Sequence, residues 1–234
     1  MQAVILAGGL GTRLGDLTSA TPKVMLPFDG KPFLHHVIRL LSNQGIRDLV
    51  ICTGYLGEKV RDFFGDGHSA GVNIQYSEEG EKLLGTGGAL KQALNLLGSY
   101  FLVLNGDTYL PIDYHEVEKE YSRAGCKAMV VVYNKMDTLV ENNIAIDSHK
   151  VVVRYDKKGV SPGLDYVDAG AIMLRKEALD YIPEGIPISL EDGVYRPLVE
   201  RGELAAFITE QRFYDIGTPE QRSVFERLVR EVTQ

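Results

Sequence analysis

The sequence predicts an α/β protein whose central sheet is mostly parallel and is covered by helices on both faces. Short apolar runs alternate with amphipathic stretches over the first half of the chain, as in right-handed βαβ units. The first run ends in a glycine-rich turn at 8–11, and a later run ends in Asn-Gly-Asp at 105–107. Because ligands of such sheets bind at the carboxyl ends of the strands, we expect both motifs to lie at one binding edge.

The elements of the first half alternate between strand and helix. Residues 2–7 form an apolar run typical of a buried parallel strand. Pro32 opens an amphipathic helix that ends near Gly45. The further expected elements are a strand at 49–53, a short helix at 60–64, a strand at 72–77, a helix at 87–97, a strand at 100–104 and a helix at 113–124.

The second half has a different pattern, with strand-like runs and little helix between them. Residues 148–150 are expected to join the second and third of these runs as a hairpin. The expected strands lie at 127–133, 143–147, 151–156, 165–174, 204–209 and 212–216, and the expected helices at 189–201 and 219–232. This half therefore predicts a smaller mixed β part. We find no repeat or Pro/Ser-rich linker, so we expect one domain over 1–234.

The composition favours a small anionic substrate over a polyanionic partner. The chain has 234 residues, 44% of them hydrophobic, and a net charge of −7. Nucleic acids and anionic membranes need clustered positive charge, so we expect neither as a partner. The first forty residues nevertheless hold more basic than acidic side chains. They are Arg13, Lys23, Lys31 and Arg39 against Asp16 and Asp29.

The cysteines and the N-terminus predict a cytoplasmic protein. Cys52 and Cys126 lie far apart in the sequence, which fits a reducing compartment better than a disulfide framework. The sequence shows no signal-peptide pattern and no apolar run near the roughly 20 residues that span a bilayer. The sequence leaves both a monomer and a dimer open.

The glycine-rich turn fits a phosphate-binding loop, although two familiar loop types do not match it. From Gly9 the chain reads G-L-G-T-R-L-G, one residue too long for a G-x-G-x-x-G dinucleotide site. A Walker A loop needs Gly-Lys-Ser/Thr, whereas Gly30-Lys31 is followed by proline. Glycines allow backbone N–H groups to approach phosphate oxygens, and Arg13 and Lys23 add positive charge. The turn therefore predicts a polyphosphate site.

Three motifs together resemble the sugar-1-phosphate nucleotidyltransferase family over nearly the whole chain. They are G-G-x-G-T-R-L, T-P-K-x-x-L-P and L-x-N-G-D. Further segments, Y-S-x-E, L-G-T-G-G-A, N-G-D-T, S-L-E and Y-D-I-G-T-P-E, are most similar to the D-glycero-D-manno-heptose 1-phosphate guanylyltransferases. The resemblance implies a Rossmann-like three-layer sandwich, the nucleotide-diphospho-sugar transferase fold. It also implies a nucleotide-binding half at 1–125 and a sugar-phosphate-binding half at 126–234.

The resemblance implies an enzyme of nucleotide-sugar biosynthesis. A nucleoside triphosphate, with GTP favoured, would react with a sugar 1-phosphate, with the heptose 1-phosphate favoured, to give an NDP-sugar and pyrophosphate. The sugar phosphate would attack the α-phosphorus in line with the help of Mg²⁺, so positioning and charge neutralisation matter more than a nucleophilic side chain. A UTP-dependent N-acetylmuramate 1-phosphate enzyme and a mannose or glucose 1-phosphate enzyme stay open. So does a non-catalytic nucleotide-sugar-binding regulator.

The resemblance assigns the nucleotide and metal roles to named residues. Arg13 would bind the outer phosphates, Lys23 would neutralise charge near the α-phosphate, and Asp107 would complete the catalytic set. Asp107 follows an apolar strand, where a carboxylate is costly unless it is solvated, paired or bound to metal. Asp107 and Asp215 would hold Mg²⁺. The implied nucleotide-binding residues are Leu6, Ala7, Gly8, Gly9, Gly11, Thr12, Arg13, Lys23, Glu79, Glu81, Gly85, Thr86, Gly88, Asn105 and Gly106.

The base and the sugar are assigned with alternatives left open. A guanine edge offers two N–H donors, so a carboxylate is its natural partner, and either Glu79 or Glu81 would supply it. Lys157 would bind the sugar phosphate and Asp156 a sugar hydroxyl. The implied sugar-phosphate-binding residues are Asn143, Asp156, Lys157, Asp168, Gly170 and Glu191. Relatives usually have glycine at the position of Asn143 and asparagine at that of Asp168, so the chain departs from the family on the sugar side.

Overall fold

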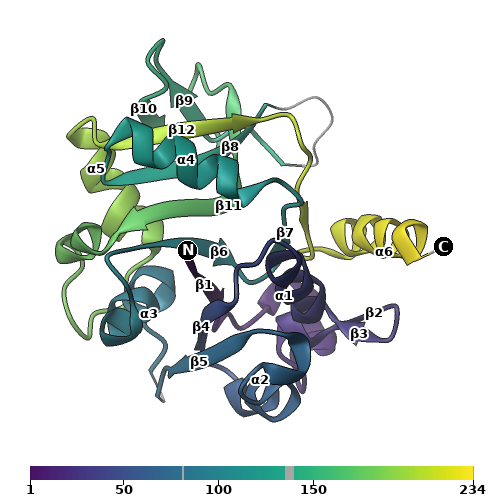
Figure 1. Cartoon of the computed structure of the whole chain (residues 1–234). Coiled ribbons are helices and arrows are strands. Elements are labelled where there is room, and N and C mark those ends of the chain that lie inside the picture. Colours follow the sequence, from purple (N-terminus) through teal and green to yellow (C-terminus); the bar gives the residue numbers. More distant parts are fainter. Residues whose placement is uncertain (81, 135–139, 234) are drawn as a thin grey trace.

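A computed structural model describes residues 1–80, 82–134 and 140–233, without the side chains of residues 16, 232 and 233. Within these residues a nine-stranded sheet runs in the order β10-β9-β11-β6-β1-β4-β5, and β8 continues it by pairing with β11 and β12. Helices cover both faces of this sheet (Figure 1). The predicted three-layer α/β fold is confirmed.

The first half forms the parallel part of the sheet. β1 (Gln2–Ala7) lies between β4 (Asp48–Thr53) and β6 (Tyr100–Asn105), parallel to both, and β5 (Asn73–Glu78) extends the sheet beyond β4. In this register Leu6 pairs with Cys52 on one side and Asn105 on the other. The carboxyl ends of these strands therefore meet at one edge, as predicted.

Alternate residues of β1 pack into two different cores, which explains its continuous apolar run. Ala3 and Ile5 belong to the cluster that includes side chains of α1 (Phe33–Asn43) and α4 (Tyr114–Ala124). Val4 and Leu6 belong to the cluster on the opposite face, with side chains of α3 (Gly85–Gln92) and α5 (Arg196–Glu200). Residues 3–7 are therefore all apolar, because helices exclude water from both faces of this part of the strand.

The second half continues the same sheet with mostly antiparallel pairing. β11 (Tyr166–Arg175) runs antiparallel to both β6 and β8 (Ala128–Asn134), and β12 (Leu204–Thr209) is parallel to β8. β9 (Ile144–Ile146) and β10 (Val152–Tyr155) form the predicted hairpin. One hydrogen-bonded sheet thus passes through both halves of the chain. The division of labour between a nucleotide half and a sugar half stays a prediction.

Short elements account for most of the differences from the sequence-based assignment. The run expected at 212–216 shrinks to β13 (Tyr214–Asp215), which pairs with β7 (Thr108–Tyr109). The helix expected from 87 begins at Gly85. The remaining short elements are the hairpin β2 (Pro27–Phe28) and β3 (Lys31–Pro32), a π-helix (Glu191–Tyr195), and 3-10 segments at Thr12–Thr18, Lys23–Met25, His68–Ala70, Ala93–Leu96 and Lys176–Tyr181.

The remaining helices complete the layer on the α1 side. Phe64 of α2 (Gly57–Phe64) and Phe225 of α6 (Pro219–Thr233) are buried in the same cluster as the α1 side chains. Phe63, the residue before Phe64 in α2, is 51% exposed. In the described part of the chain we find no helix with both the length and the apolarity needed to cross a bilayer.

Candidate active site

A cleft of about 570 Å³ opens at the carboxyl ends of β1, β4 and β6. It draws its walls from both halves of the chain, which is the arrangement that a site for two substrates needs. Sixteen of the sequence-predicted site residues line it: Leu6, Ala7, Gly8, Gly9, Gly11, Thr12, Arg13, Lys23, Glu79, Gly85, Thr86, Asn105, Asp107, Lys157, Asp168 and Glu191.

The glycines of the first turn differ in what they do. A β-carbon at Gly8 would stand 2.6 Å from Oε2 of Glu79, so the turn and that carboxylate pack directly together. Gly11 has a φ of +65°, and a β-carbon there would meet the side chain of Thr18 at 2.8 Å. Gly9 has open space where a β-carbon would be. The backbone conformation and packing therefore require glycine at Gly11, and a side chain at Gly8 would displace the Glu79 carboxylate, whereas Gly9 leaves room for a ligand to approach the backbone.

Lys23 and Asp107 form an ion pair in the cleft. The Lys23 Nζ donates to Asp107 Oδ2 at 2.5 Å, and Lys23 is only 9% exposed. An ammonium group with so little water around it needs an anionic partner, and the carboxylate that follows β6 supplies one. The pair brings together the T-P-K and N-G-D motifs, which lie 84 residues apart in the sequence.

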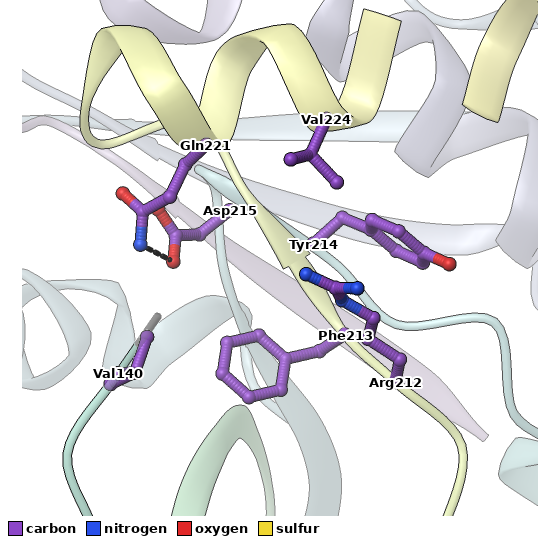
Figure 2. A pocket seen from close by; sticks show the side chains of 7 residues that line it. All are labelled: Val140, Arg212, Phe213, Tyr214, Asp215, Gln221 and Val224. Atoms are coloured by element: carbon purple, nitrogen blue, oxygen red, sulfur yellow. Dashed lines mark hydrogen bonds between the residues drawn. The ribbon is translucent and has the colours of Figure 1, made fainter. Parts of the chain in front are cut away.

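Asp215 lies next to Asp107 because β13 pairs with β7. In that pairing Asp215 is opposite Thr108, and the Ile216 N–H donates to the Asp107 carbonyl at 3.1 Å. The Asp215 carboxylate accepts hydrogen bonds from the Gly217 N–H at 2.9 Å and from Gln221 Nε2 at 2.6 Å. Figure 2 shows the contact with Gln221. The pairing of β13 with β7 thus places Asp215 beside the segment that follows Asp107, and the role of the two carboxylates as metal ligands stays a prediction.

The electrostatics of Asp215 fit a neighbouring cation. Burial raises the pKa of its carboxyl, and the negative charge of Asp107 raises it further against the effect of the Gly217 N–H. A divalent cation would relieve both effects, since it favours the ionised form of each carboxylate. Among residues 1–80, 82–134 and 140–233 no group of three or more His, Cys, Asp or Glu side chains could hold a metal. Mg²⁺ bound by these two carboxylates would need the remaining oxygens from phosphates and water.

Asp215 itself does not line the large cleft. It lines a separate cavity of about 30 Å³, together with Arg212, Phe213 and Gln221 (Figure 2). That volume accommodates roughly one water molecule and no substrate. Arg13 connects the two regions: it lines the cleft, and a β-carbon at Gly217 would stand 3.2 Å from its Nη2. The guanidinium group thus lies beside the Asp215-Gly217 turn.

Glu79 is the described carboxylate on the predicted base side of the cleft. Its Oε1 accepts a hydrogen bond from the Leu84 N–H at 2.6 Å, and burial raises the pKa of its carboxyl. This contact closes the loop that connects β5 to α3. Glu81, the alternative base-reading residue, lies outside the described residues.

The glycine motif at the start of α3 contributes residues to the cleft wall and also packs against a neighbouring segment of the chain. Gly85 and Thr86 line the cleft, but the N–H groups of Gly87 and Gly88 both donate to the Ile188 carbonyl. The Leu190 N–H donates to Thr86 Oγ1 at 2.8 Å. The motif therefore holds the segment that leads to Glu191. The prediction that Gly88 binds the nucleotide needs correction, because Gly88 is buried away from the cleft against this segment.

Gly106 also proves to be a packing residue. A β-carbon at this position would stand 2.5 Å from the Leu6 carbonyl oxygen, and the Gly106 N–H donates to the same oxygen at 3.0 Å. Gly106 does not line the cleft, in contrast to the prediction. Its lack of a side chain lets the chain cross the end of β1, which places Asp107 beside Lys23.

On the sugar side the structure separates cleft residues from supporting residues. Lys157 forms an ion pair with Glu191 at 2.8 Å across the cleft, and Asp168 lines the same region. Asn143 and Gly170 do not line the cleft but hold Asp168: Asn143 Oδ1 accepts from the Asp168 N–H, and the Gly170 N–H donates to Asp168 Oδ1.

The prediction for Asp156 is not supported by its position. Its carboxylate accepts hydrogen bonds from the Ser161 hydroxyl at 2.6 Å and from the N–H groups of Lys158 and Ser161. The side chain thereby closes its own turn, and it does not line the cleft. The Asp-Lys-Lys sequence resembled a substrate-binding segment, but only Lys157 of it reaches the cleft.

Sequence reasoning missed several cleft residues. Tyr195 is the most informative, because its hydroxyl forms a hydrogen bond with the Asp168 carboxylate. It follows Glu191 by four residues, a spacing that places two side chains on one side of a helix, so the S-L-E motif could have indicated it. The other missed lining residues are Leu10, Val24, Cys52, Leu83, Ala89 and Leu190. They are mostly apolar and carry no motif.

Comparisons with known proteins agree with this geometry. A model of the family described as "Nucleotidyl transferase" matches residues 2–226. The chain is 34% identical over 223 residues to a D-glycero-alpha-D-manno-heptose 1-phosphate guanylyltransferase of Campylobacter jejuni, a match that covers 94% of this chain and 96% of the relative. It is 31% identical to a mannose-1-phosphate guanylyltransferase of Mycobacterium tuberculosis, over 94% of this chain but only 62% of that relative.

Solved structures give the same picture. The crystal structure of HddC from Yersinia pseudotuberculosis matches with a TM-score of 0.85 at 29% identity, over 97% of this chain and 99% of that one. HddC complexed with GMP-PN matches with a TM-score of 0.84 at 28% identity and the same coverage.

Proposed function

Because the chain belongs to the nucleotidyl transferase family, we propose that it is a guanylyltransferase that joins GTP to a heptose-class sugar 1-phosphate and releases pyrophosphate. The observation that carries this proposal is the single cleft that unites Arg13, Lys23 and Asp107 from the first half with Lys157 and Glu191 from the second. The heptose 1-phosphate and GTP are favoured by the names of relatives from Campylobacter jejuni and Aneurinibacillus thermoaerophilus and by the GMP-PN complex of HddC.

The residues of the first half would bind and activate the triphosphate. The turn at 8–11 and Arg13 would receive the outer phosphates, and Lys23 would neutralise charge that builds up at the α-phosphate. Magnesium held by Asp107 and Asp215 would supply further neutralisation of the phosphate oxygens. No side chain has to act as a nucleophile, because the sugar phosphate oxygen attacks the α-phosphorus and pyrophosphate leaves. The protein contributes position and charge.

Lys157 would bind the phosphate of the sugar 1-phosphate. In the structure its ammonium group is paired with Glu191 at 2.8 Å, and its side chain is 67% exposed, so it can exchange this partner for a phosphate at low cost. Released from Lys157, the carboxylate of Glu191 would accept hydrogen bonds from sugar hydroxyls. The ion pair is thus a resting arrangement of two substrate-binding groups.

The proposal is tested by assaying each of the four nucleoside triphosphates with each of several sugar 1-phosphates in the presence of Mg²⁺. The readout is the release of pyrophosphate. We expect GTP with D-glycero-α-D-manno-heptose 1-phosphate to give the highest kcat/KM. Preference for UTP with N-acetylmuramate 1-phosphate, or for a mannose or glucose 1-phosphate, would select one of the alternatives within the family. Failure of every combination would contradict catalysis and favour a nucleotide-sugar-binding regulator.

Glu79→Gln is expected to reduce kcat/KM for GTP about 10- to 100-fold while affecting UTP much less. A carboxylate can accept both the N1–H and N2–H of guanine, whereas an amide turns one acceptor into a donor, and a hydrogen bond to a charged group contributes about 1.5–3 kcal/mol. Glutamine keeps an oxygen for the Leu84 N–H, so the loop is preserved. The measurement is steady-state pyrophosphate release with each triphosphate.

Glu78→Gln is the matched control for this prediction. Glu78 is the neighbouring residue, but it is exposed and paired with Arg61 at 2.7 Å, and it does not line the cleft. Glu78→Gln should leave kcat/KM for GTP and kcat/KM for UTP unchanged. Equal losses for GTP and UTP in Glu79→Gln would mean that Glu79 only holds the loop and does not read the base.

A further inference from the structure

The sugar end of the cleft carries an excess of negative charge. Asp168 and Glu191 both line it, and the basic side chain there, Lys157, is already paired with Glu191 at 2.8 Å. Tyr195, from the same short helix as Glu191, adds a hydroxyl that is hydrogen-bonded to Asp168. Among the described side chains at this end, two carboxylates therefore stand against one positively charged group, the Lys157 ammonium.

Asp168 is fixed in place by neutral groups. Its backbone N–H donates to Asn143 Oδ1 at 2.8 Å, and its Oδ1 accepts from the Gly170 N–H at 2.9 Å. A side chain at Gly170 would collide with Thr108, since a β-carbon would stand 2.9 Å from its Oγ1. This packing keeps β11 close to β7. The carboxylate therefore cannot be turned away from the cleft without breaking its hydrogen bonds to the strand.

Binding of the sugar phosphate would increase the charge imbalance. Under the proposed function Lys157 pairs with the phosphate and leaves Glu191, so Glu191 and Asp168 both remain to meet the sugar ring. Hydroxyl groups and amino groups donate hydrogen bonds to carboxylates, whereas a carboxylate on the sugar offers only acceptors and a like charge. A like charge in a partly desolvated site acts against binding more strongly than the loss of one contact.

We propose that Asp168 makes the sugar end of the cleft select its substrate by charge: it admits sugar 1-phosphates whose ring bears hydroxyl or amino groups and rejects those that bear a carboxylate. This inference rests on the proposed function and narrows it. It excludes uronic acid 1-phosphates and sugars with a lactyl ether, such as N-acetylmuramate 1-phosphate, and it adds amino sugar 1-phosphates to the expected substrates.

The ionisation of Asp168 is compatible with this role at neutral pH. Burial raises the pKa of its carboxyl to about 6, and the charge of Glu191 contributes to the rise against the effects of the Gly170 N–H, Tyr195 and Lys157. At pH 7.5 the carboxyl is therefore mostly ionised in the folded protein. These groups come from β11, the π-helix and the turn after β10, and Tyr155 of β10 also lies close enough to interact with the Asp168 charge.

The test uses three sugar 1-phosphates that share one ring and differ in one substituent. They are a neutral hexose 1-phosphate, its 2-amino-2-deoxy derivative and its 6-carboxylate, each with GTP and Mg²⁺ at pH 7.5. For the wild-type chain we expect kcat/KM for the acid to be at least about tenfold below that for the neutral sugar, and the amino sugar to equal or exceed the neutral one. For Asp168→Asn we expect the ratio of acid to neutral sugar to rise about tenfold.

Asp192→Asn is the matched control, because it removes one negative charge from the same short helix. Asp192 is exposed and paired with Arg196 at 2.9 Å, and it does not line the cleft. We expect it to leave the ratio unchanged. An equal shift in Asp192→Asn, an unchanged ratio in Asp168→Asn, or equal turnover of acid and neutral sugars by the wild-type chain would each overturn the proposal.

A calorimetric measurement separates this proposal from the proposed catalysis. Binding of the three sugar 1-phosphates to the full chain should follow the same order even when no pyrophosphate is released. Selective binding without turnover would contradict the catalytic function alone, and equal affinity for the neutral and acidic sugars would overturn the selection by charge.

The folding of Asp168→Asn can be checked in the same series. A carboxyl whose pKa is raised in the folded protein stabilises it below the unfolded pKa of about 4, and this contribution is lost as the pH rises through about 6. At pH 7.5 the asparagine variant should therefore unfold at the wild-type temperature or above it. Its advantage should shrink as the pH falls toward 4.

Discussion

Lys23→Met is expected to lower kcat/KM for pyrophosphate release about 10²- to 10³-fold. Removal of one preorganised group that stabilises charge in a transition state typically has an effect of this size. Methionine fills nearly the same space as the buried stem of Lys23, which is 9% exposed, so the loss should be chemical and not structural. Steady-state kinetics with GTP and the preferred sugar 1-phosphate provide the measurement.

The control for Lys23 is a partly buried lysine outside the cleft. Lys91 is half-buried on α3 and donates to the Leu179 carbonyl at 3.0 Å, and it does not line the cleft. Lys91→Met should retain turnover near the wild-type rate, and both variants should unfold cooperatively. Turnover within about threefold of wild type in Lys23→Met would contradict a role of this side chain in the reaction.

A double-mutant cycle with Asp107→Asn separates two roles of Lys23. Because Nζ of Lys23 and Oδ2 of Asp107 are 2.5 Å apart, Lys23 could act on the substrate directly or only hold Asp107 in place. If Lys23 only orients Asp107, the double variant should be no slower than Asp107→Asn. We expect a further loss in the double variant, since the ammonium group neutralises phosphate charge in addition to pairing with the carboxylate.

The buried strands were the part of the fold that the sequence predicted best. The strand predicted at 2–7 has the bounds of β1, and its residues 3–7 are all apolar because they are buried between the two cores. The short strands β7 and β13 gave no such signal. Each has two residues, and their pairing depends on a contact between segments more than 100 residues apart, which no local pattern encodes.

For the candidate site, sequence patterns located charged groups better than they assigned the glycines. Lys23 and Asp107, which the resemblance assigned to one catalytic set, form an ion pair in the structure. Gly106 of the N-G-D motif and Gly88 of the L-G-T-G-G-A motif lack side chains for packing reasons, because a β-carbon would meet Leu6 and Ile186 respectively. A motif cannot reveal whether a glycine makes room for a ligand or for a neighbouring strand. That distinction requires knowledge of what lies beside it in space.

The departures on the sugar side show a related limit. Asn143 and Asp168 are the two positions at which the resemblance predicted a departure from the family, and the Asn143 side chain accepts a hydrogen bond from the Asp168 N–H. Asp156 was assigned to the sugar by its neighbour Lys157, but its carboxylate accepts hydrogen bonds from Lys158 and Ser161 in the turn that follows. The position of this segment in the sequence correctly predicted that it reaches the cleft, but it did not correctly predict which of its side chains does so.

Asp107→Asn and Asp215→Asn are each expected to raise the Mg²⁺ concentration for half-maximal turnover at least tenfold and to lower kcat about 10²-fold or more. The described residues offer no third acidic ligand nearby, so the ion would have few oxygen ligands from the protein and each carboxylate would supply one of them. Asparagine keeps the shape and removes the charge. The asparagine at position 215 should also leave the fold intact. Gln221 can rotate its side-chain amide so that its Oε1, which is buried without a hydrogen-bond partner, accepts a hydrogen bond from the new amide.

Binding of Mn²⁺ in the presence of GTP and without sugar phosphate tests this prediction independently of turnover, by the loss of the free-ion signal in electron paramagnetic resonance. Both variants should bind Mn²⁺ at least tenfold more weakly than the wild-type chain. Asp48→Asn is the control, because Asp48 is an exposed carboxylate at the start of β4, at the opposite end of that strand from the cleft. If Asp107→Asn weakened Mn²⁺ binding while Asp215→Asn did not, Asp215 would be a partner for Arg13 and the Gly217 turn and not a metal ligand. That outcome would fit its place outside the cleft, and the metal would then depend on Asp107 and the phosphates alone.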